Sequence, residues 1–264
     1  FGTAHQHEDK LSLLLYMGNK LVLTEGGNYA YDDSEMRRYV LSTRSHNTIR
    51  VDGMDQNRGR DYVWKEEDIH KNSGMEYSIT EDYDYAKGIY EEGYGPEVDR
   101  SITHTRSVYF IKNPERLTVV KEGVGEKEKL EPFFIVVDRM NADCPHTYET
   151  LWHLDTREVQ IQNNRVISKE LSILTSVSNA NSTIICGQEK PEWQGFRAYG
   201  GSQGEYLPVP TLQQKTVGQN IRMVTVFYPG EQRSMERVEA AIACSEREIR
   251  FVTRNGWMLK WDEK

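Results

Sequence analysis

The stretch LSLLLYMGNKLVLT, residues 11–24, predicts a β-hairpin near the start of the chain. Two apolar runs, Leu11–Tyr16 and Leu21–Thr24, flank the pair Gly18-Asn19. Glycine and asparagine tolerate the positive φ angles that two-residue hairpin turns require. The hairpin therefore favours an antiparallel fold over alternating strands and helices.

The same combination of apolar runs and short turns recurs along the chain. Further pairs of strand-like runs flank turn signals at Ser107–Ile111 and Leu117–Lys121 around Asn113-Pro114, at Val159–Ile161 and Val166–Ser168 around Asn163-Asn164, and at Ile249–Thr253 and Trp257–Trp261 around Asn255-Gly256. Single apolar runs lie at Pro132–Val137, Tyr148–Leu154, Thr183–Cys186 and Arg222–Tyr228. Strands at such regular intervals predict an all-β fold, a large, multi-stranded antiparallel β-sandwich of the supersandwich kind.

One segment departs from the strand pattern. Asp33–Leu41 predicts a short helix, with Asp33 as its N-cap and Glu35 near the positive end of the helix dipole. We expect residues 54–95 to form long loops and edge strands, and residues 200–214 to form a surface loop. The length of 264 residues fits one large all-β domain as well as two small ones, and we favour one domain over residues 1–264.

Composition limits the classes of ligand. The formal charge of −8 argues against a nucleic-acid ligand, because such ligands need clustered Lys and Arg. A local basic lining remains compatible with that total, since arginines gather early in the chain, at Arg37, Arg38, Arg44, Arg50, Arg58 and Arg60. Three scattered cysteines predict no disulfide framework. We expect no membrane span and find no signal peptide, and the abrupt start at Phe1 is consistent with an excised domain or a processed chain.

Two histidines lie close to the start of the chain. His5-Gln6-His7 places imidazoles at positions i and i+2, which point to the same face of an extended strand. Both rings are therefore able to serve one site, and this spacing is common among metal sites. The alternative is a pair of polar side chains on a solvent-facing edge, or a frayed terminus. We interpret three other histidines as structural: His104, His146 and His153.

Glu25 and His46 extend this candidate site. Glu25 ends the predicted hairpin, and in-register pairing brings the end of its second strand beside the start of the first, near His7. His46 precedes the strand Ile49–Val51. Two histidines and a carboxylate suit zinc, with the rings fixed by an acceptor such as a backbone carbonyl or Asp9. The alternative is that Glu25 supports the glycine-rich turn that follows it.

An ordered series of segments resembles the heparinase II/III-like family. The most specific ones lie in the first quarter of the chain, at His5-Gln6-His7-Glu8-Asp9-Lys10-Leu11-Ser12, Leu21-Val22-Leu23-Thr24-Glu25-Gly26-Gly27-Asn28-Tyr29, Arg38-Tyr39 and residues 42–53. Less specific matches lie downstream, at residues 104–112 and 134–139. The likeness therefore spans much of the chain.

Members of that family join an N-terminal (α/α) toroid to a C-terminal β-sandwich and cleave uronic-acid polysaccharides by β-elimination. The resemblance implies that this chain is the β-sandwich portion of such a lyase, acting on a polymer like heparin, heparan sulfate or alginate. It implies a catalytic position for His5 and metal positions, typically zinc, for His7, Glu25 and His46. One departure is Glu25-Gly26-Gly27, where the family usually has Asp-Pro-Gly.

The chemistry of β-elimination explains the expected residue types. The C5 proton of a uronate becomes acidic enough to remove only when the neighbouring carboxylate is neutralised. We expect His5 to act as the base or as the neutralising group. Candidates for binding anionic or hydroxyl groups are Arg37, Arg38, Arg44 and Asn47, and candidates for stacking or proton transfer are Tyr29, Tyr31 and Tyr39. Each of these also has an ordinary interpretation as a surface or capping residue.

Two further expectations and two rivals complete the interpretation. Because the toroid supplies the family's acid/base tyrosine, we expect this chain alone to be a weak or inactive lyase. The resemblance also implies a periplasmic or secreted bacterial location. The main rival is a non-catalytic carbohydrate-binding or scaffold sandwich, which needs no clustered histidines. A cupin-like metalloenzyme, prompted by Gly2 before His5-Gln6-His7, lacks the downstream glutamate spacing of that pattern.

Overall fold

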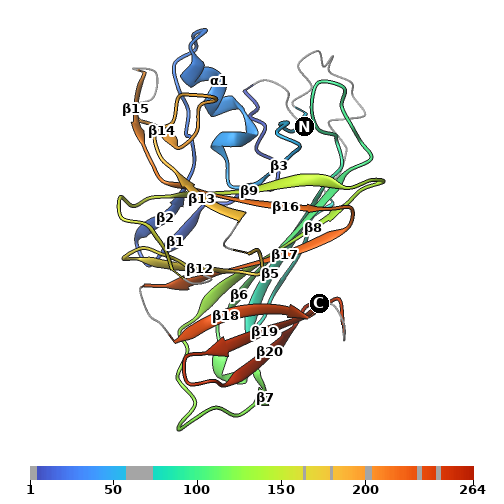
Figure 1. Cartoon of the computed structure of the whole chain (residues 1–264), viewed down its shortest axis with the longest axis vertical. Helices are drawn as coiled ribbons and strands as arrows, with labels where there is room; N and C mark the ends of the chain where they lie inside the picture. Colours follow the sequence, from blue (N-terminus) through green and yellow to red (C-terminus); the bar gives the residue numbers. More distant parts are fainter. Residues whose placement is uncertain are drawn as a thin grey trace.

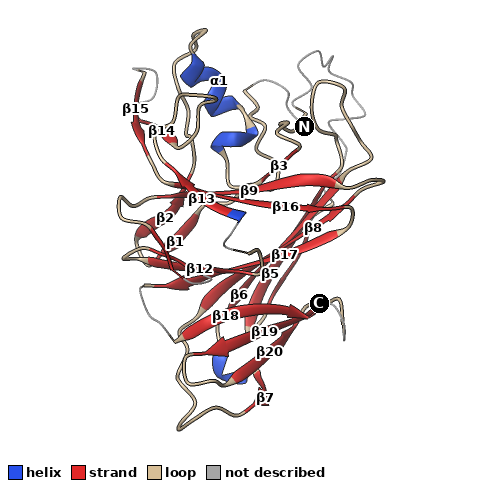
Figure 2. Ribbon diagram, in the orientation of Figure 1, coloured by secondary structure: helices blue, strands red, loops and turns tan. Residues whose placement is uncertain are grey.

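The structure is a computed structural model that describes residues 5–57, 74–162, 165–178, 181–199, 204–230, 234–241 and 245–264. Its β-sheets are stacked in layers along the long axis of the molecule (Figure 1). Strands form almost all of the regular structure within these ranges, and the one α-helix found there lies at the upper end (Figure 2). The predicted all-β sandwich with one short helix is confirmed.

A six-stranded sheet forms the upper layer. Its strands, in spatial order, are β1 (Leu15–Met17), β2 (Lys20–Thr24), β9 (His146–Leu154), β16 (Thr211–Gly218) and β13 (Ser182–Ile185), with β3 (Ile49–Val51) also paired to β9. β2 and β3 are both antiparallel to β9 and lie on its same side, one after the other, at His153–Leu154 and at Tyr148–Thr150. The sheet edge beside β9 is therefore interrupted between β2 and β3.

An eight-stranded sheet forms the middle layer. Its order is β10 (Gln160–Gln162), β11 (Arg165–Ile167), β12 (Leu171–Thr175), β17 (Ile221–Pro229), β8 (Phe133–Asn141), β6 (Thr103–Ile111), β5 (Tyr83–Tyr90) and β4 (Glu76–Ile79). Successive residues of a strand point to opposite faces. Accordingly Val136 packs with the six-stranded sheet, whereas Ile135 and Val137 pack in the other direction. Both faces of the central strand β8 are therefore buried.

Two smaller sheets complete the fold. A four-stranded sheet below the central layer has the order β18 (Met235–Ala241), β19 (Glu248–Thr253), β20 (Met258–Asp262) and β7 (Thr118–Lys121). Its Phe251 packs in one core cluster with Ile135 and Val137 of β8. At the opposite end, β14 (Phe196–Tyr199) and β15 (Glu205–Pro208) form a hairpin that lies beside helix α1 (Glu35–Leu41) (Figure 1).

The helix begins at a different residue from the one predicted. The N-cap is Ser34, whose Oγ accepts a hydrogen bond from the Arg37 backbone N–H, so the prediction that Asp33 caps the helix is wrong. Asp32 holds the Ser34 hydroxyl through a 2.5 Å hydrogen bond. A serine at this position satisfies a free N–H of the first turn as well as an aspartate does. After α1, a short 3-10 helix at Thr43–Ser45 leads to His46.

Three of the predicted hairpins pair as expected, and one does not. β1 pairs with β2, β10 with β11, and β19 with β20, although β1 begins at Leu15 and the turn residues Asn163-Asn164 lie outside the described residues. The prediction around Asn113-Pro114 is wrong, because β6 and β7 belong to different sheets. Pro114 opens a 3-10 helix at Pro114–Arg116, which directs the chain away from β6.

The two loop predictions have different outcomes. Within residues 54–95, β4 is an edge strand as expected, β5 lies beside it, and residues 58–73 lie outside the described part. The surface loop predicted at residues 200–214 is wrong from residue 205 onward. There β15 forms an exposed strand, and β16 is a central strand of the upper sheet. In the described part of the chain, no helix is long and apolar enough to cross a membrane.

A charged group is buried between the two larger sheets. Arg106 of β6 faces Asp138 of β8, and its Nε and Nη2 donate to that carboxylate at 2.7 and 3.1 Å. Asp138 also accepts a hydrogen bond from His104 Nε2 at 2.7 Å. Although burial alone raises the pKa of a carboxyl group, the nearby Arg106 and His104 lower the pKa of Asp138 to about 2. His104 is therefore structural, as the sequence predicts.

Asp138→Asn should destabilise the fold by about 3 to 5 kcal/mol at neutral pH, because Arg106 then keeps a buried charge without its partner. The folded pKa of about 2 lies below the unfolded value, so the stabilisation by Asp138 is complete above about pH 4. It is lost as the pH falls toward 2, and the gap between variant and wild type should narrow there. Urea titrations at several pH values measure this, with exposed Asp143→Asn as the control.

Candidate functional site

The candidate site forms where the upper sheet is interrupted. Thr24 at the end of β2 pairs with His153, and Ile49 at the start of β3 pairs with Thr150. The chain thus leaves β9 after Thr24 and returns to it at Ile49. The excursion between them carries α1, the 3-10 helix and most of the predicted site residues. Both ends of this excursion are fixed to one strand, which brings Glu25 close to His46.

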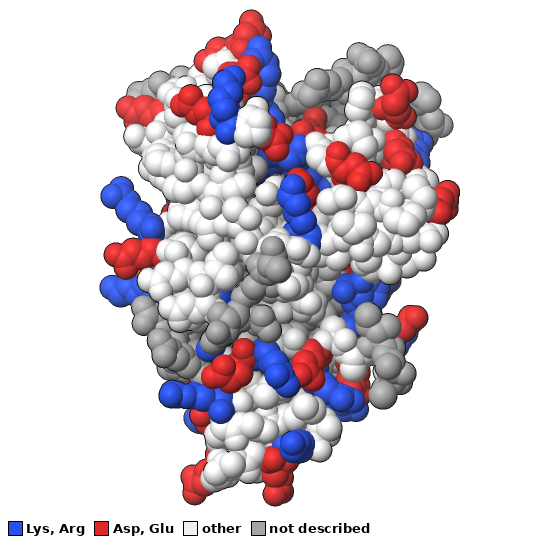
Figure 3. All heavy atoms as spheres, in the orientation of Figure 1, with Lys and Arg blue, Asp and Glu red and all other residues white. Residues whose placement is uncertain are grey.

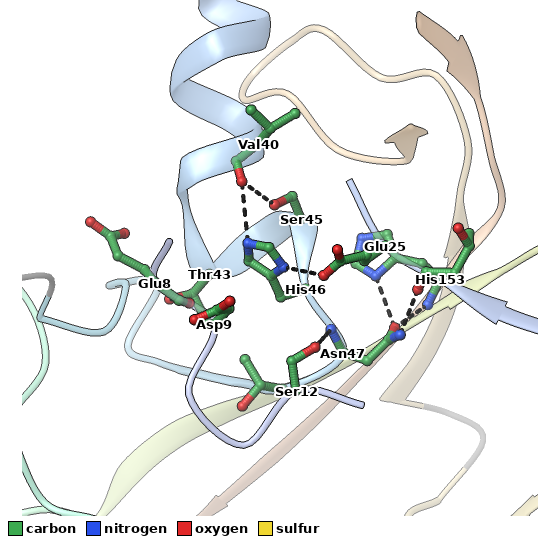
Figure 4. Close-up of polar contacts among 12 residues, drawn as sticks. Glu8, Asp9, Ser12, Glu25, Val40, Thr43, Ser45, His46, Asn47 and His153 are labelled. Carbon is green, nitrogen blue, oxygen red and sulfur yellow. Dashed lines mark hydrogen bonds and ion pairs between the residues drawn. The ribbon is translucent and has the colours of Figure 1, made fainter. Parts of the chain in front are cut away.

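Asn47 fills the gap between β2 and β3. Its Nδ2 donates to the backbone carbonyls of Leu13 and Thr24. Its Oδ1 accepts from the backbone N–H of His153 at 2.7 Å (Figure 4). The Nδ1–H of His153 also donates to this oxygen, at 3.1 Å. The side chain is fully buried, so its amide satisfies backbone groups at this interruption that water does not reach.

Glu25 and His46 form a short polar contact in this gap. Glu25 Oε2 lies 2.8 Å from His46 Nδ1, and the imidazole is fully buried (Figure 4). Gly26 allows the approach, since a Cβ at this position would lie 2.5 Å from the Cβ of Ser45. Burial alone raises the pKa of the Glu25 carboxyl, yet hydrogen bonding and charge from His46 outweigh this and lower it.

The second ring nitrogen of His46, Nε2, shows where the ring carries a proton and what Nδ1 can bind. His46 Nε2 is 3.2 Å from the carbonyl oxygen of Val40, which only accepts hydrogen bonds, so Nε2 carries a proton. Nδ1 then faces a carboxylate. Either it carries a second proton, or its lone pair and the carboxylate both point at a cation. A ring fixed by a backbone carbonyl behind it is typical of a metal-binding histidine.

His7 lies beside this pair. Its ring centroid is 5.3 Å from that of His46. Its backbone is held in place by the next residue, because the Glu8 N–H donates to the Leu41 carbonyl at 2.9 Å and the Thr43 hydroxyl donates to the Glu8 carbonyl. Burial, and then the neighbouring His46, lowers the pKa of His7. A neutral imidazole with a free lone pair is the form that binds metals.

His7, Glu25 and His46 are residue types that bind zinc, but the contacting atoms of Glu25 and His46 lie closer together than two zinc ligands do. Within the described ranges, no three His, Cys, Asp or Glu side chains already form a metal cage. Tetrahedral zinc holds nitrogen and oxygen ligands about 3.4 Å apart. The contact between His46 and Glu25 is 2.8 Å, so the two atoms would have to separate by a few tenths of an ångström. The glutamate, about one third exposed, has room to move.

His5 lies with exposed residues at the outer end of this region. Its Nδ1 is 2.9 Å from the Tyr31 hydroxyl, and the guanidinium carbon of Arg37 lies 4.3 Å from the centre of the Tyr31 ring. Arg37 Nη1 donates to the side chain of Asn28 at 3.0 Å and to the carbonyl of Tyr29. The structure therefore groups a histidine, a phenol and a cation on accessible surface. This grouping is separate from the contact between Glu25 and the buried His46.

The other residues that the sequence predicts to contact substrate differ in exposure. Arg38 is exposed and pairs with Glu35 at 2.6 Å, and Arg44 is held by Glu192 at 3.1 Å. Tyr39 is fully buried, with its hydroxyl 3.3 Å from His153 Nε2. Tyr39 and Asn47 thus bind other protein groups in this structure. Among the clustered arginines, Arg50 is buried between acidic partners, and Arg58 and Arg60 lie outside the described residues.

The sequence predicted a structural role for His153 but not its contact with Asn47, and it gave no signal for Gln194. His153 is fully buried, and burial lowers its pKa to about 3, so the ring is neutral and holds Asn47. Gln194 Nε2 donates to the Arg44 carbonyl at 3.0 Å and lies 3.4 Å from His153. Both come from parts of the chain far from the excursion. The only signal in the sequence was the position of His153 within an apolar strand.

Asn47→Ala should destabilise the protein by about 3 kcal/mol or more, because two carbonyls and one N–H lose buried partners worth about 1 to 3 kcal/mol each. Urea titration at neutral pH measures the change. The control is Asn141→Ala, at an exposed position at the end of β8. Equal unfolding midpoints for the two variants would contradict the role given to Asn47.

Comparisons with known proteins agree with this architecture. The model of the family described as "Heparinase II/III-like, C-terminal" matches residues 1–242. Among curated proteins, no sequence matches this chain.

Among solved structures, one titled "Heparinase III-BT4657 gene product" has a TM-score of 0.66 and 13% identity, over 98% of this chain and 37% of that one. Heparan sulfate lyase HepC from Pedobacter heparinus has a TM-score of 0.65 and 15% identity, over 97% and 36%. A third, titled "Crystal Structure of Heparinase III", has a TM-score of 0.62 and 14% identity, over 99% and 37%.

These likenesses show a shared fold, and this chain spans little more than a third of the length of those proteins. The match to the family model shows family membership, because it covers most of the chain. The chain belongs to the Heparinase II/III-like, C-terminal family.

Proposed function

We propose that this chain is the β-sandwich part of a polysaccharide lyase that cleaves a uronic-acid-containing polymer by β-elimination. The observation that carries the proposal is the accessible group His5, Tyr31 and Arg37, which lies next to the half-buried His7 and Glu25 and the buried His46 in a chain of this family. The reacting groups are more accessible than the supporting groups.

The exposed group has the parts that β-elimination requires. The reaction needs a positive or hydrogen-bonding group for the uronate carboxylate and a base for the C5 proton. When His5 Nδ1–H donates to the Tyr31 oxygen, the Nε2 lone pair of His5 is free to accept a proton. Arg37 lies over the Tyr31 ring and supplies positive charge beside it. His5 is thus the proposed base or neutralising group, and Tyr31 orients it.

Charge on the surrounding surface is mixed. Figure 3 shows acidic and basic side chains interspersed on the face that it draws. Arg38 and Arg44 carry acidic partners, Glu35 and Glu192, that a bound polyanion would compete with. We propose Tyr29, Tyr31, Arg38 and Arg44 as substrate contacts, and Tyr39 and Asn47 as residues that position them.

The proposal includes a zinc ion held by His7, Glu25 and His46. When bound there, the metal would supply a fixed positive centre that stiffens the edge of the sheet below His5. The support is the Nε2–H of His46, which faces the Val40 carbonyl and leaves Nδ1 toward Glu25. An upstream (α/α) toroid domain and a periplasmic or secreted location complete the proposal. The domain rests on the greater length of the matched enzymes, and the location rests on the family resemblance alone.

Zinc should raise the thermal unfolding midpoint of the chelator-treated wild-type chain. A ligand present at 100 times its dissociation constant stabilises the folded state by about 2.7 kcal/mol. Glu25→Gln, which removes the carboxylate charge, should lose most of that shift, whereas Glu35→Gln on the exposed side of α1 should keep it. Calorimetry with and without zinc, together with elemental analysis of the purified protein, measures this. No shift in wild type and no bound metal would exclude the metal from the proposal.

His5→Ala should lower the rate of lysis by about 100-fold to 10,000-fold, the usual contribution of a positioned acid or base. The assay follows the ultraviolet absorbance of unsaturated uronides, using the chain joined to its native upstream region and a panel of uronic-acid polysaccharides. His146→Gln, at the far end of β9, should keep the wild-type rate. Saturable binding of a polysaccharide without any lysis would instead favour the non-catalytic carbohydrate-binding domain.

A further inference from the structure

A second group of reactive side chains lies at the end of β9 that is opposite the candidate site. Cys144 Sγ is 3.4 Å from His146 Nε2, and His146 Nδ1 is 2.6 Å from Asp52 Oδ2. His146 and His153 are at the two ends of β9, roughly 23 Å apart at 3.3 Å per residue. The group is therefore separate from the proposed lyase site.

The three side chains have the order of a nucleophile, a base and a group that orients the base. Asp52 accepts the Nδ1–H of His146, which leaves the Nε2 lone pair directed at the thiol of Cys144. The other carboxylate oxygen of Asp52 accepts the Thr147 backbone N–H at 2.8 Å, so the carboxylate is fixed. The thiol is exposed, whereas the imidazole is about 10% exposed.

The local backbone keeps this arrangement in place. The sequence Cys144-Pro145-His146 puts a proline between the thiol and the imidazole, which restricts both Pro145 and the residue before it. The turn is also tied to the β16–β17 connection, because Gln219 Nε2 donates to the Asp143 carbonyl at 2.9 Å and Asn220 accepts from the Ala142 N–H. The thiol is therefore held next to its base without a bound ligand.

We propose that Cys144 is a thiol-exchange site that takes up small-molecule disulfides. In the reaction, His146 Nε2 accepts the proton of the Cys144 thiol, and the resulting thiolate attacks one sulfur of the disulfide. A new sulfur–sulfur bond forms on Cys144 as the disulfide's own bond breaks. The released thiolate takes the proton from His146. The Cys144 sulfur is oxidised, the departing sulfur is reduced, and the product is a mixed disulfide on the surface of the chain.

Among the described residues, Asp52, Asp99 and Tyr148 are the charged and titratable groups that face His146 beside Cys144. Asp52 approaches from the turn after β3, Asp99 interacts with His146 from the segment before β6, and the Tyr148 ring lies 6.2 Å away on β9. Cys186 is also exposed, but its thiol differs from that of Cys144, because partial burial of the Cys186 sulfur raises its pKa.

Cys186 therefore provides a matched control within the same chain. Two parent variants are needed: C186S/C244S, which keeps Cys144, and C144S/C244S, which keeps Cys186. Cys244 is replaced in both because it lies outside the described residues. The probe is dipyridyl disulfide, whose released pyridinethione absorbs light, and mass spectrometry locates the mixed disulfide.

At neutral pH the Cys144 thiol should react about tenfold or more faster than the Cys186 thiol. The reason is that the thiolate is the reactive form, and His146 Nε2 lies 3.4 Å from the Cys144 sulfur, where it can accept the thiol proton. His146→Gln in the C186S/C244S parent should remove most of this advantage and move the rate–pH curve to higher pH. Asp52→Asn, which keeps an oxygen for the Thr147 N–H, should give a smaller shift in the same direction. Unchanged circular dichroism would show that both variants are folded. Equal rates for the two cysteines, or an unchanged curve in His146→Gln, would overturn the proposal.

Discussion

The arrangement of the two larger sheets depends on the buried guanidinium of Arg106. Its charge is balanced by Asp138 on the neighbouring strand, and its Nη1 reaches across the sheet interface to the carbonyls of Leu11 and Asn47. It also lies 4.9 Å from the centre of the Trp152 ring, on the opposing sheet. A buried ion pair adds little net stability compared with apolar residues of the same size. We expect Arg106 to contribute instead to the specificity of the fold. Its five N–H donors point in fixed directions within one plane, so the carbonyls around it must lie along those directions.

The same contact connects the core to the candidate site. Arg106 binds the carbonyl of Asn47, while the side chain of Asn47 binds β2, β9 and the incoming N-terminal segment. The side chain thereby fixes where the excursion starts and where it ends, and Glu25 and His46 lie at these two points. The neutral ring of His153 is part of this support, since its Nδ1–H binds Asn47 and its Nε2 faces Tyr39. A core interaction in the middle sheet thus sets the geometry of a polar pair in the upper one.

The sequence predicted whatever depends on near neighbours. Gly18-Asn19 and Asn255-Gly256 marked real hairpins, because the turn chemistry and both strands are contiguous. Asn113-Pro114 misled, because β7 pairs with β20, far along the chain, and no local signal encodes that partner. The hairpin predicted that Glu25 lies near His7, but the strand pattern predicted neither its contact with His46 nor the burial of Tyr39 and Asn47. Their partners, such as His153 and Phe196, are supplied by strands whose order in the sheets only the folded chain defines.

The interruption of the upper sheet explains why the site residues lie where they do. Residues within a continuous strand have their backbone groups committed to the ladder and their side chains alternating between two faces. Residues 25–48 are released from this constraint, yet both ends of the segment are attached to β9. The segment is long enough to form α1, and it is anchored well enough for Gly26 to lie against Ser45 without room for a Cβ. A polar cluster with a buried half and an exposed half needs this combination, because a strand alone would place neighbouring side chains on opposite faces. In this chain the more shielded half is the buried His46 with Glu25, which is about one third exposed, and the exposed half is His5 with Tyr31.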